Sequence, residues 1–291
     1  MSRVYYIHAG AHRTGSSSFQ MCLHVNRDAL DAAGYDLAYP GRDGIPSGRL
    51  DLRLPSPRHG AGPHPVLVQR SKAALGDGDR PMILSEENIA GRMFHFYQGQ
   101  FYPAAEARCR ALKDALNGPV ARLVLVIRPY AGLYASAFRK RAEDNPVRPF
   151  REVVPQLMTM DRGWPELVAL MRDVLAPEAF EVVPFAVRGA SRDLLYRLVP
   201  EAGAGWTEPE EVVNLSATDA ALEALQARYH AGDALDRAAW KAVIAKHAGD
   251  TGRGFAAFTD AERNTLDTLY NRDLLRISEM DGVSLAPSAP V

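Results

Sequence analysis

Residues 4–19 read VYYIHAGAHRTGSSSF, which joins an apolar run of strand length to a loop that contains glycines, hydroxyl residues and an arginine. The run Val4–Ile7 predicts a buried strand, and the loop extends from His8 to Ser18. Residues at helical spacing predict a helix directly after the loop, and they are Phe19, Cys22, Leu23, Asn26 and Leu30. Gly34 is well placed to end this helix in the left-handed conformation. The order of strand, loop and helix predicts an α/β fold with an anion site at the helix N-terminus.

Further apolar runs along the chain alternate with helical patterns. Strands are predicted at 81–84, 120–127 and 180–185, and helices at 66–75, 104–117 and from Tyr130 onward. Such alternation predicts a central parallel sheet with helices on both faces, as in P-loop NTPases. From about residue 190 the pattern is mostly helical, over 217–229, 238–247 and 259–280, and the tail from 284 to 291 is expected to fray. We therefore expect one domain over residues 1–291, with residues 205–283 as a helical appendage packed on it.

Composition narrows the classes of partner. The formal net charge is −1, so no overall field attracts nucleic acid or an anionic membrane, and any anion site must be built locally. The N-terminus does not resemble a signal peptide, and no apolar stretch approaches the roughly 20 residues that span a bilayer, so we expect a cytoplasmic protein. Cys22 and Cys109 have neither disulfide nor zinc-ligand spacing and are expected to be apolar core residues.

The loop has the Gly-x4-Gly spacing of a phosphate-binding P-loop, from Gly10 to Gly15. A nucleotide triphosphatase needs lysine directly after the second glycine, whereas this chain has Ser16 there. Its cation is Arg13, whose guanidinium can form a bidentate contact with a sulfate or a phosphate. The hydroxyls of residues 16–18 can donate to a phosphate at the helix start, although serines also cap helices in proteins without such a site. The loop therefore favours an anionic ligand and disfavours ATP hydrolysis.

The residues from Ile7 to Gln20 closely resemble the 5′-phosphosulfate loop of the sulfotransferase family, especially its bacterial branch, where the loop is written around Lys-Thr-Gly-Thr-Thr. The stretches 30–35 (LDAAGY) and 39–41 (YPG) are similar to the segment after that loop in bacterial members. A second element agrees. Arg128 ends the strand predicted at 120–127, and Ser136 follows eight residues later on the next helix, which resembles the family's pair for the 3′-phosphate of 3′-phosphoadenosine 5′-phosphosulfate (PAPS).

This resemblance implies an enzyme that moves a sulfuryl group from PAPS to a hydroxyl or amine by in-line displacement, releases PAP and needs no metal. It implies that the donor is bound by Arg13, Thr14, Gly15, Ser16, Ser17, Ser18, Arg128 and Ser136. Arg13 stands where the family has its loop lysine and would stabilise the charge of the leaving group. A fainter resemblance links residues 251–255 (TGRGF) to a late segment that closes over the 3′-phosphate in cytosolic members.

The acceptor proton requires a base, for which the strand end at Ser85-Glu86-Glu87 is the first candidate. We favour Glu86, because such strand ends border the ligand crevice in parallel sheets and because this Ser-Glu segment resembles bacterial members of the family, and Glu87 is a close rival. His59, His64 and His95 are alternatives, since imidazole titrates near neutrality. His8 and His12 flank the loop and are expected to orient it.

Two other functions fit the same residues. An atypical P-loop kinase acting on a small molecule would need ATP, Mg²⁺ and a carboxylate such as Glu86, and the missing loop lysine weighs against it. A nucleotide-binding protein that kept the fold and lost the chemistry is the non-enzymatic alternative. The acceptor, a small molecule or a glycan, and the oligomeric state are left open. Residues 40–65 and 143–163 are expected to shape the acceptor pocket.

Overall fold

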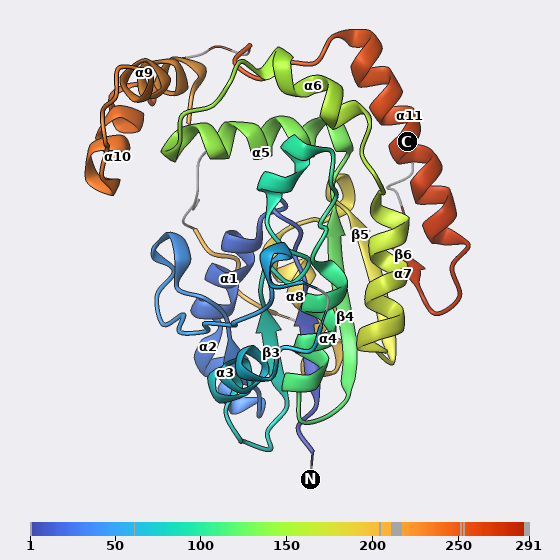
Figure 1. The fold of residues 1–291 in the computed structure, drawn as a ribbon. Helices are drawn as coiled ribbons and strands as arrows, with labels where there is room; N and C mark the ends of the chain where they lie inside the picture. The colour runs from blue at the N-terminus through green and yellow to red at the C-terminus, as the bar shows by residue number, and fades with distance from the viewer. Residues whose placement is uncertain are drawn as a thin grey trace.

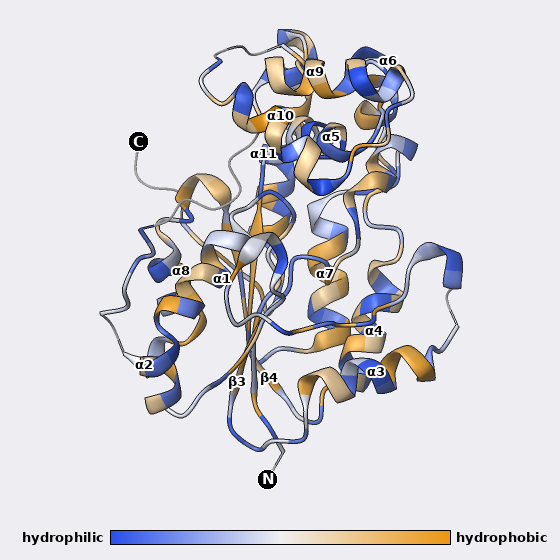
Figure 2. Cartoon of the chain, turned by 90° about the vertical axis from the view of Figure 1, so that its left-hand side faces the viewer, coloured by the Kyte–Doolittle hydropathy of each residue, from blue (hydrophilic) through white to orange (hydrophobic). Residues whose placement is uncertain are grey.

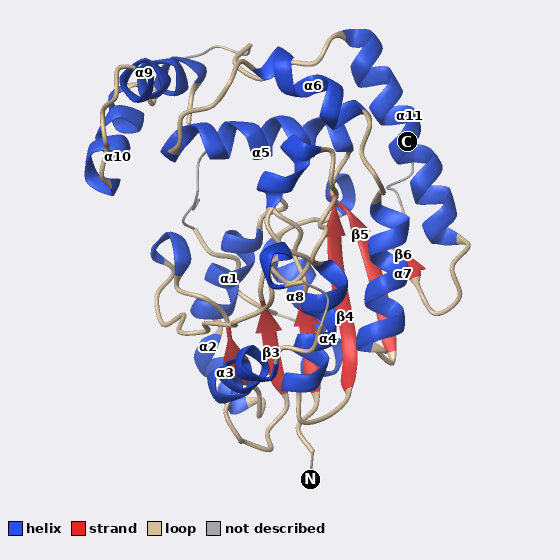
Figure 3. Cartoon of the chain, in the orientation of Figure 1, coloured by secondary structure: helices blue, strands red, loops and turns tan. Residues whose placement is uncertain are grey.

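The structure is a computed structural model, and it describes residues 2–60, 62–203, 205–210, 217–250, 252 and 254–287. Within these residues the strands form one six-stranded sheet of order β2-β3-β1-β4-β5-β6, in which every neighbouring pair is parallel (Figure 3). The strands are β1 (Tyr5–His8), β2 (Asp36–Ala38), β3 (Met82–Ser85), β4 (Val120–Ile127), β5 (Ala179–Pro184) and β6 (Ser284–Leu285).

Helices cover both faces of the sheet, because the central strands are apolar on both sides. In β4, Leu123 and Leu125 pack into one apolar cluster while Val124 and Val126 pack into the other, as the two-residue period of a strand requires. Figure 2 shows the two helical layers flanking the sheet. One layer holds α1 (Ser16–Val25), α2 (Arg27–Ala32) and α8 (Ser191–Leu198), and the other holds α3 (Pro65–Leu75), α4 (Ala105–Ala115) and α7 (Trp164–Leu175).

A further group of helices lies beyond the carboxyl ends of the strands (Figure 1). It consists of α5 (Tyr130–Asp144), α6 (Phe150–Met158), α9 (Asp219–His230), α10 (Arg237–Lys246) and α11 (Asp260–Ser278). Buried polar contacts fasten it together. The Tyr130 hydroxyl donates to Asp273 at 2.6 Å and accepts from the Trp164 backbone at 2.8 Å, which joins α5, α11 and α7. Arg139 pairs with Asp219 and so joins α5 to α9.

The predicted fold class, a parallel sheet with helices on both faces, is confirmed, whereas two local predictions are wrong and one strand was not predicted. The helix after the loop is two helices, because Asn26 turns its amide back to the Cys22 carbonyl at 2.8 Å and also to the Thr207 carbonyl at 2.8 Å. Residues 36–38 form an unpredicted edge strand. The tail is not frayed from residue 284, since Ser284 and Leu285 pair with β5.

No helix in the described part of the chain is long and apolar enough to cross a bilayer. Cys22 and Cys109 are both free and buried, which confirms them as core residues. The residues Thr251 and Arg253 of the faintly family-like segment lie outside the described residues.

Candidate functional site

The predicted loop follows β1 at the point where the strand order of the sheet reverses. β1 and β4 are neighbours, but the chain leaves β1 toward β2 and leaves β4 toward β5, on the other side. In open parallel sheets ligands bind at such a reversal, beyond the carboxyl ends of the two strands. The loop of residues 9–15 follows β1, and Arg128 follows β4 directly. Two elements 115 residues apart in the chain therefore meet at one edge.

Arg13 is the point at which these elements touch. Its Nε donates to the Ser136 Oγ at 2.8 Å, and its own carbonyl accepts from Arg128 Nη1 at 3.0 Å. Arg13 also has a positive φ of 64°, a left-handed conformation that is rare for a residue with a side chain. The structure thus brings together the loop, the strand end and the helix residue that the sequence singled out.

The remaining loop residues shape the start of α1. Gly15 precedes the helix with a φ of 87°, and no side-chain hydrogen bond caps the helix there. A helix start without such a cap presents backbone N–H groups and the positive end of the helix dipole. Ser17 and Ser18 are half-buried in the first turn. The hydroxyl of Thr14 instead donates to the Ala11 carbonyl, so it closes the turn rather than facing a ligand.

A narrow cradle lies at Gly10. A Cβ added there would lie 2.2 Å from the Ser16 Oγ and 2.6 Å from the His8 Cε1. The Ser16 Oγ and the His8 Nε2 are both buried and lack a hydrogen-bond partner among the described residues. Since buried polar atoms are nearly always hydrogen-bonded, these two atoms retain hydrogen-bonding capacity that the described residues do not satisfy.

His8 is uncharged in this setting. Its Nδ1 lies 3.0 Å from the Ser85 Oγ, and burial followed by the nearby Arg188 lowers the pKa of His8 to about 3. When Nδ1 accepts from the Ser85 hydroxyl, Nε2 carries the ring proton and can donate it to an anion.

Arg188 is a cation of the site that sequence reasoning missed. Its Nη2 contacts the Gly15 carbonyl at 3.4 Å and the Ser191 Oγ at 3.0 Å, while its buried Nε has no partner within the described chain. Burial lowers the pKa of Arg188, and burial together with the charge of Arg13 lowers the pKa of Arg128. Desolvated cations crowded around one loop are stabilised by an anion between them. Arg188 follows β5 and a short turn at Phe185–Val187, so inspecting all the strand ends would have found it.

Glu86, the favoured base, lies directly after β3 and is almost fully buried. Arg42 holds its carboxylate in a bidentate pair, with Nη1–Oε1 and Nη2–Oε2 distances of 2.9 and 2.7 Å. The backbone and side-chain nitrogens of Asn88 also donate to Oε1, at 2.8 and 3.0 Å. A substrate hydroxyl must displace one of these donors to reach Glu86. Its rival Glu87 is more exposed and contacts only Arg42 among the described residues, at 3.3 Å.

A second histidine, His12, connects the residues after β3 to the loop. The His12 Nε2 lies 2.9 Å from the Asn88 Oδ1, which joins the loop to the Glu86 and Arg42 pair. Burial lowers the pKa of His12, so it too is neutral near pH 7. His59 and His95 line a separate cavity beside Glu86, and His64 contacts the Gly60 carbonyl at 3.2 Å.

Gly10→Ala should destabilise the protein by about 1–3 kcal/mol, the usual cost of overpacking, because the new methyl group overlaps Ser16 and His8. Urea unfolding of the variant and the parent protein measures this difference. Gly249→Ala is the matched control, since a Cβ there meets nothing within 4 Å. If both variants unfold at the parent's urea concentration, the cradle is not packed as described.

No protein-family model, no curated protein and no solved structure matches this chain. Among the described residues there is also no group of three or more His, Cys, Asp or Glu side chains that could hold a metal ion. The function is therefore inferred from the geometry of the site.

Proposed function

We propose that this protein is a PAPS-dependent sulfotransferase. The observation that carries the proposal is the convergence of Arg13, Ser136 and Arg128 at the carboxyl ends of β1 and β4. The sequence resemblance assigns these residues to opposite ends of one bisphosphorylated nucleotide, which requires them to be neighbours. Had the fold put Arg128 at another edge of the sheet, a single small molecule could not touch both elements.

In this proposal the loop from Gly10 to Ser18 binds the 5′-phosphosulfate and Arg128 with Ser136 binds the 3′-phosphate. The first assignment is supported by the start of α1 and by the buried atoms of Ser16, His8 and Arg188 that have no hydrogen-bond partner in the described chain. The second is supported by the guanidinium of Arg128, which is partly desolvated and can form charge-assisted hydrogen bonds with a phosphate.

The proposed reaction is a displacement at sulfur. The acceptor oxygen or nitrogen forms a bond to sulfur while the bond from sulfur to the bridging oxygen breaks, and PAP leaves with that electron pair. Arg13 and Arg188 would stabilise the negative charge that grows on the 5′-phosphate, since preorganised cations act strongly in a partly desolvated site. The acceptor proton goes to a base beside β3.

Glu86 remains our candidate for that base, and its present hydrogen-bond donors determine how an acceptor hydroxyl can reach it. It lies between the loop and a cavity large enough for a small molecule, and it is linked to the loop through Asn88 and His12. To accept a proton it must exchange the Arg42 or Asn88 donor for the acceptor hydroxyl. If that exchange does not occur, Glu86 only positions Arg42 and Asn88. Glu87 is then the candidate carboxylate that accepts the proton of the acceptor.

Thermal unfolding with PAP, ADP or ATP plus Mg²⁺ tests the proposal. At about 100 times its Kd, PAP should stabilise the folded state by about 2.7 kcal/mol and raise Tm by several degrees, while ADP should act less because it has no 3′-phosphate. A response to ATP with Mg²⁺ that exceeds the response to PAP would indicate a kinase. Absence of any response to PAP would refute the sulfotransferase assignment.

A further inference from the structure

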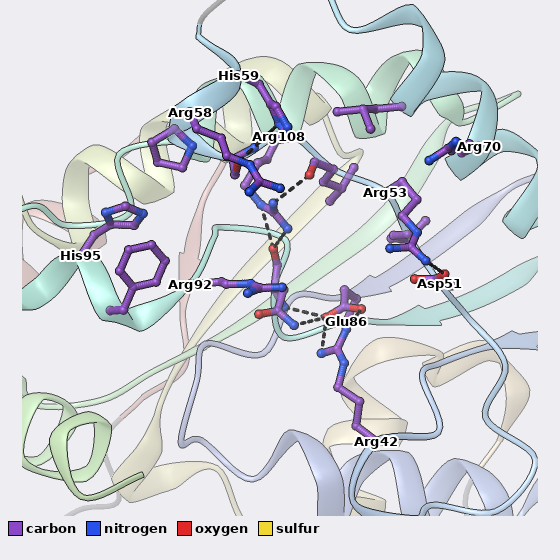
Figure 4. Close-up of a pocket in the computed structure, with 17 residues that line it drawn as sticks. Arg42, Asp51, Arg53, Arg58, His59, Arg70, Glu86, Arg92, His95 and Arg108 are labelled. Carbon is purple, nitrogen blue, oxygen red and sulfur yellow. Dashed lines mark hydrogen bonds and ion pairs between the residues drawn. The ribbon is translucent and has the colours of Figure 1, made fainter. Parts of the chain in front are cut away.

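A cavity of about 690 Å³ opens beside the carboxyl end of β3 (Figure 4). Its walls come from the irregular segment at 42–59, from α3, from residues 86–95 and from Arg108 of α4. The segment at 40–65, which we expected to shape an acceptor pocket, contributes lining residues to this cavity, whereas residues 143–163 do not line it. A volume of this size suits a small molecule.

The lining is strongly cationic although the whole chain is nearly neutral. Within the described chain, six arginines line the cavity against two carboxylates, and each carboxylate is already paired. Glu86 pairs with Arg42 at 2.7 Å, and Asp51 pairs with Arg53 at 2.5 Å. The other lining arginines at the surface make no side-chain hydrogen bond or ion pair with a described residue. These are Arg58, Arg70 and Arg92.

Arg108 adds a charge at the inner wall. It is buried and donates to backbone carbonyls, among them Pro55 at 2.5 Å and Ile89 at 3.1 Å, but it has no carboxylate partner among the described residues. Burial lowers the pKa of Arg108 to about 10, although the charge of Glu86 opposes this shift, so Arg108 stays protonated at neutral pH. Carbonyl dipoles orient this guanidinium without cancelling its charge, and its field therefore extends into the cavity.

His95 supplies a second, independent sign of a ligand. Its side chain is only 8% exposed and lines the cavity, its Nδ1 lies 3.1 Å from the Gln98 Oε1, and its Nε2 has no partner in the described chain. A buried ring nitrogen without a partner is costly, and a polar group of a ligand in the cavity would satisfy it.

We infer that this cavity binds the acceptor and that the acceptor is a small polyanion, a phosphorylated or carboxylated molecule that also carries a hydroxyl or amine. Its role as the acceptor site rests on the proposed function, because Glu86 and Asn88 line the cavity and connect it to the loop through His12. The anionic groups would pair with Arg58, Arg70 and Arg92. A neutral or cationic acceptor would leave these charges unused.

Calorimetric titration of the PAP-saturated protein tests this inference at a fixed ionic strength. The probes are pyrophosphate, citrate and glucose, which represent phosphates, carboxylates and neutral hydroxyl compounds. Pyrophosphate, citrate or both should bind with a Kd below about 1 mM, whereas glucose should not. Binding of pyrophosphate alone would indicate a phosphorylated acceptor, and binding of citrate alone a carboxylated one.

A triple variant with Arg58→Gln, Arg70→Gln and Arg92→Gln should weaken the binding of the anion by about 30-fold or more, because each lost charge-assisted hydrogen bond contributes at least a few-fold. A charge-matched control carries Arg148→Gln, Arg237→Gln and Arg263→Gln, three exposed arginines outside the cavity lining. The control should retain the affinity of the parent. Both triple variants alter exposed side chains without ion pairs in the described chain, so both should keep the parent's Tm.

The inference is overturned if neither anion binds, if glucose binds as well as the anions do, or if the two triple variants lose affinity equally. Failure of the proposed function is a separate result, since it would appear as the absence of stabilisation by PAP. In that case titration of the PAP-free parent and triple variants still decides whether the cavity is an anion site.

Discussion

Arg13→Ala should lower the turnover of PAPS by about 10²- to 10³-fold, the usual effect of removing one preorganised donor from a developing negative charge. The affinity for PAP should change only a few-fold, because the loop backbone, Arg128 and Ser136 are retained. Release of PAP from PAPS measures turnover, with water as the acceptor until a better one is found, and calorimetry measures the affinity. An unchanged rate would refute the role of Arg13 in stabilising the leaving group.

Two further variants separate charge from geometry at this position. Arg13→Lys keeps the cation and restores the residue found in the family that the loop resembles, so it should retain a rate within about tenfold of the parent.

Ser136→Ala removes the hydroxyl that accepts from the Arg13 Nε at 2.8 Å. If Ser136 acts only by holding Arg13, this variant should lower the rate and leave PAP affinity unchanged. If Ser136 binds the 3′-phosphate, PAP affinity should fall.

Arg128→Ala should weaken PAP binding by about 30- to 150-fold, which corresponds to roughly 2–3 kcal/mol for a lost charge-assisted contact in a partly desolvated site. The reason is that the guanidinium of Arg128 is the cation at the end of β4 and its pKa is lowered by burial and by Arg13, so a bound phosphate relieves an unfavourable environment. Calorimetric titration of the parent and the variant with PAP gives the ratio of the dissociation constants.

AMP is the ligand control for this prediction, since it lacks the 3′-phosphate but keeps the 5′-phosphate and the adenosine. Arg128 also donates to the Arg13 carbonyl at 3.0 Å and lies over the Phe185 ring, so its loss can disturb the loop itself. A direct contact with the 3′-phosphate weakens PAP far more than AMP. Equal weakening of both ligands would show that Arg128 only supports the loop.

Much of the fold could be predicted because the necessary signals are local. The bounds of β4, Val120–Ile127, match the prediction, since its run from Leu123 to Ile127 is continuously apolar, as a strand segment buried on both faces requires. Residues 36–38 and 284–285 have no such signal. Strands of three and two residues have almost no stability of their own and form only because β3 and β5 offer a paired edge.

The candidate site residues also divide into those with a local sequence signal and those that only the fold brings to the site. Gly10, Arg13 and Gly15 could be identified because the spacing of glycines and a cation after a strand already describes an anion loop. Arg128 and Ser136 were singled out because their order and their eight-residue separation resemble the 3′-phosphate pair of the sulfotransferase family. Arg188 belongs to no motif, and it reaches Gly15 only because β5 lies beside β4.

The chain's own pattern was enough for the class of fold and the position of the loop. Each depends on backbone preferences and side-chain periodicity within one strand, loop or helix, or on the few residues that join them. Three features depend on the tertiary structure. Arg188 contacts the loop, and Arg42 forms an ion pair with Glu86. Four further arginines line one cavity, namely Arg58, Arg70, Arg92 and Arg108. These residues are tens of residues or more from their partners, and the order of the strands and the packing of the core bring them together.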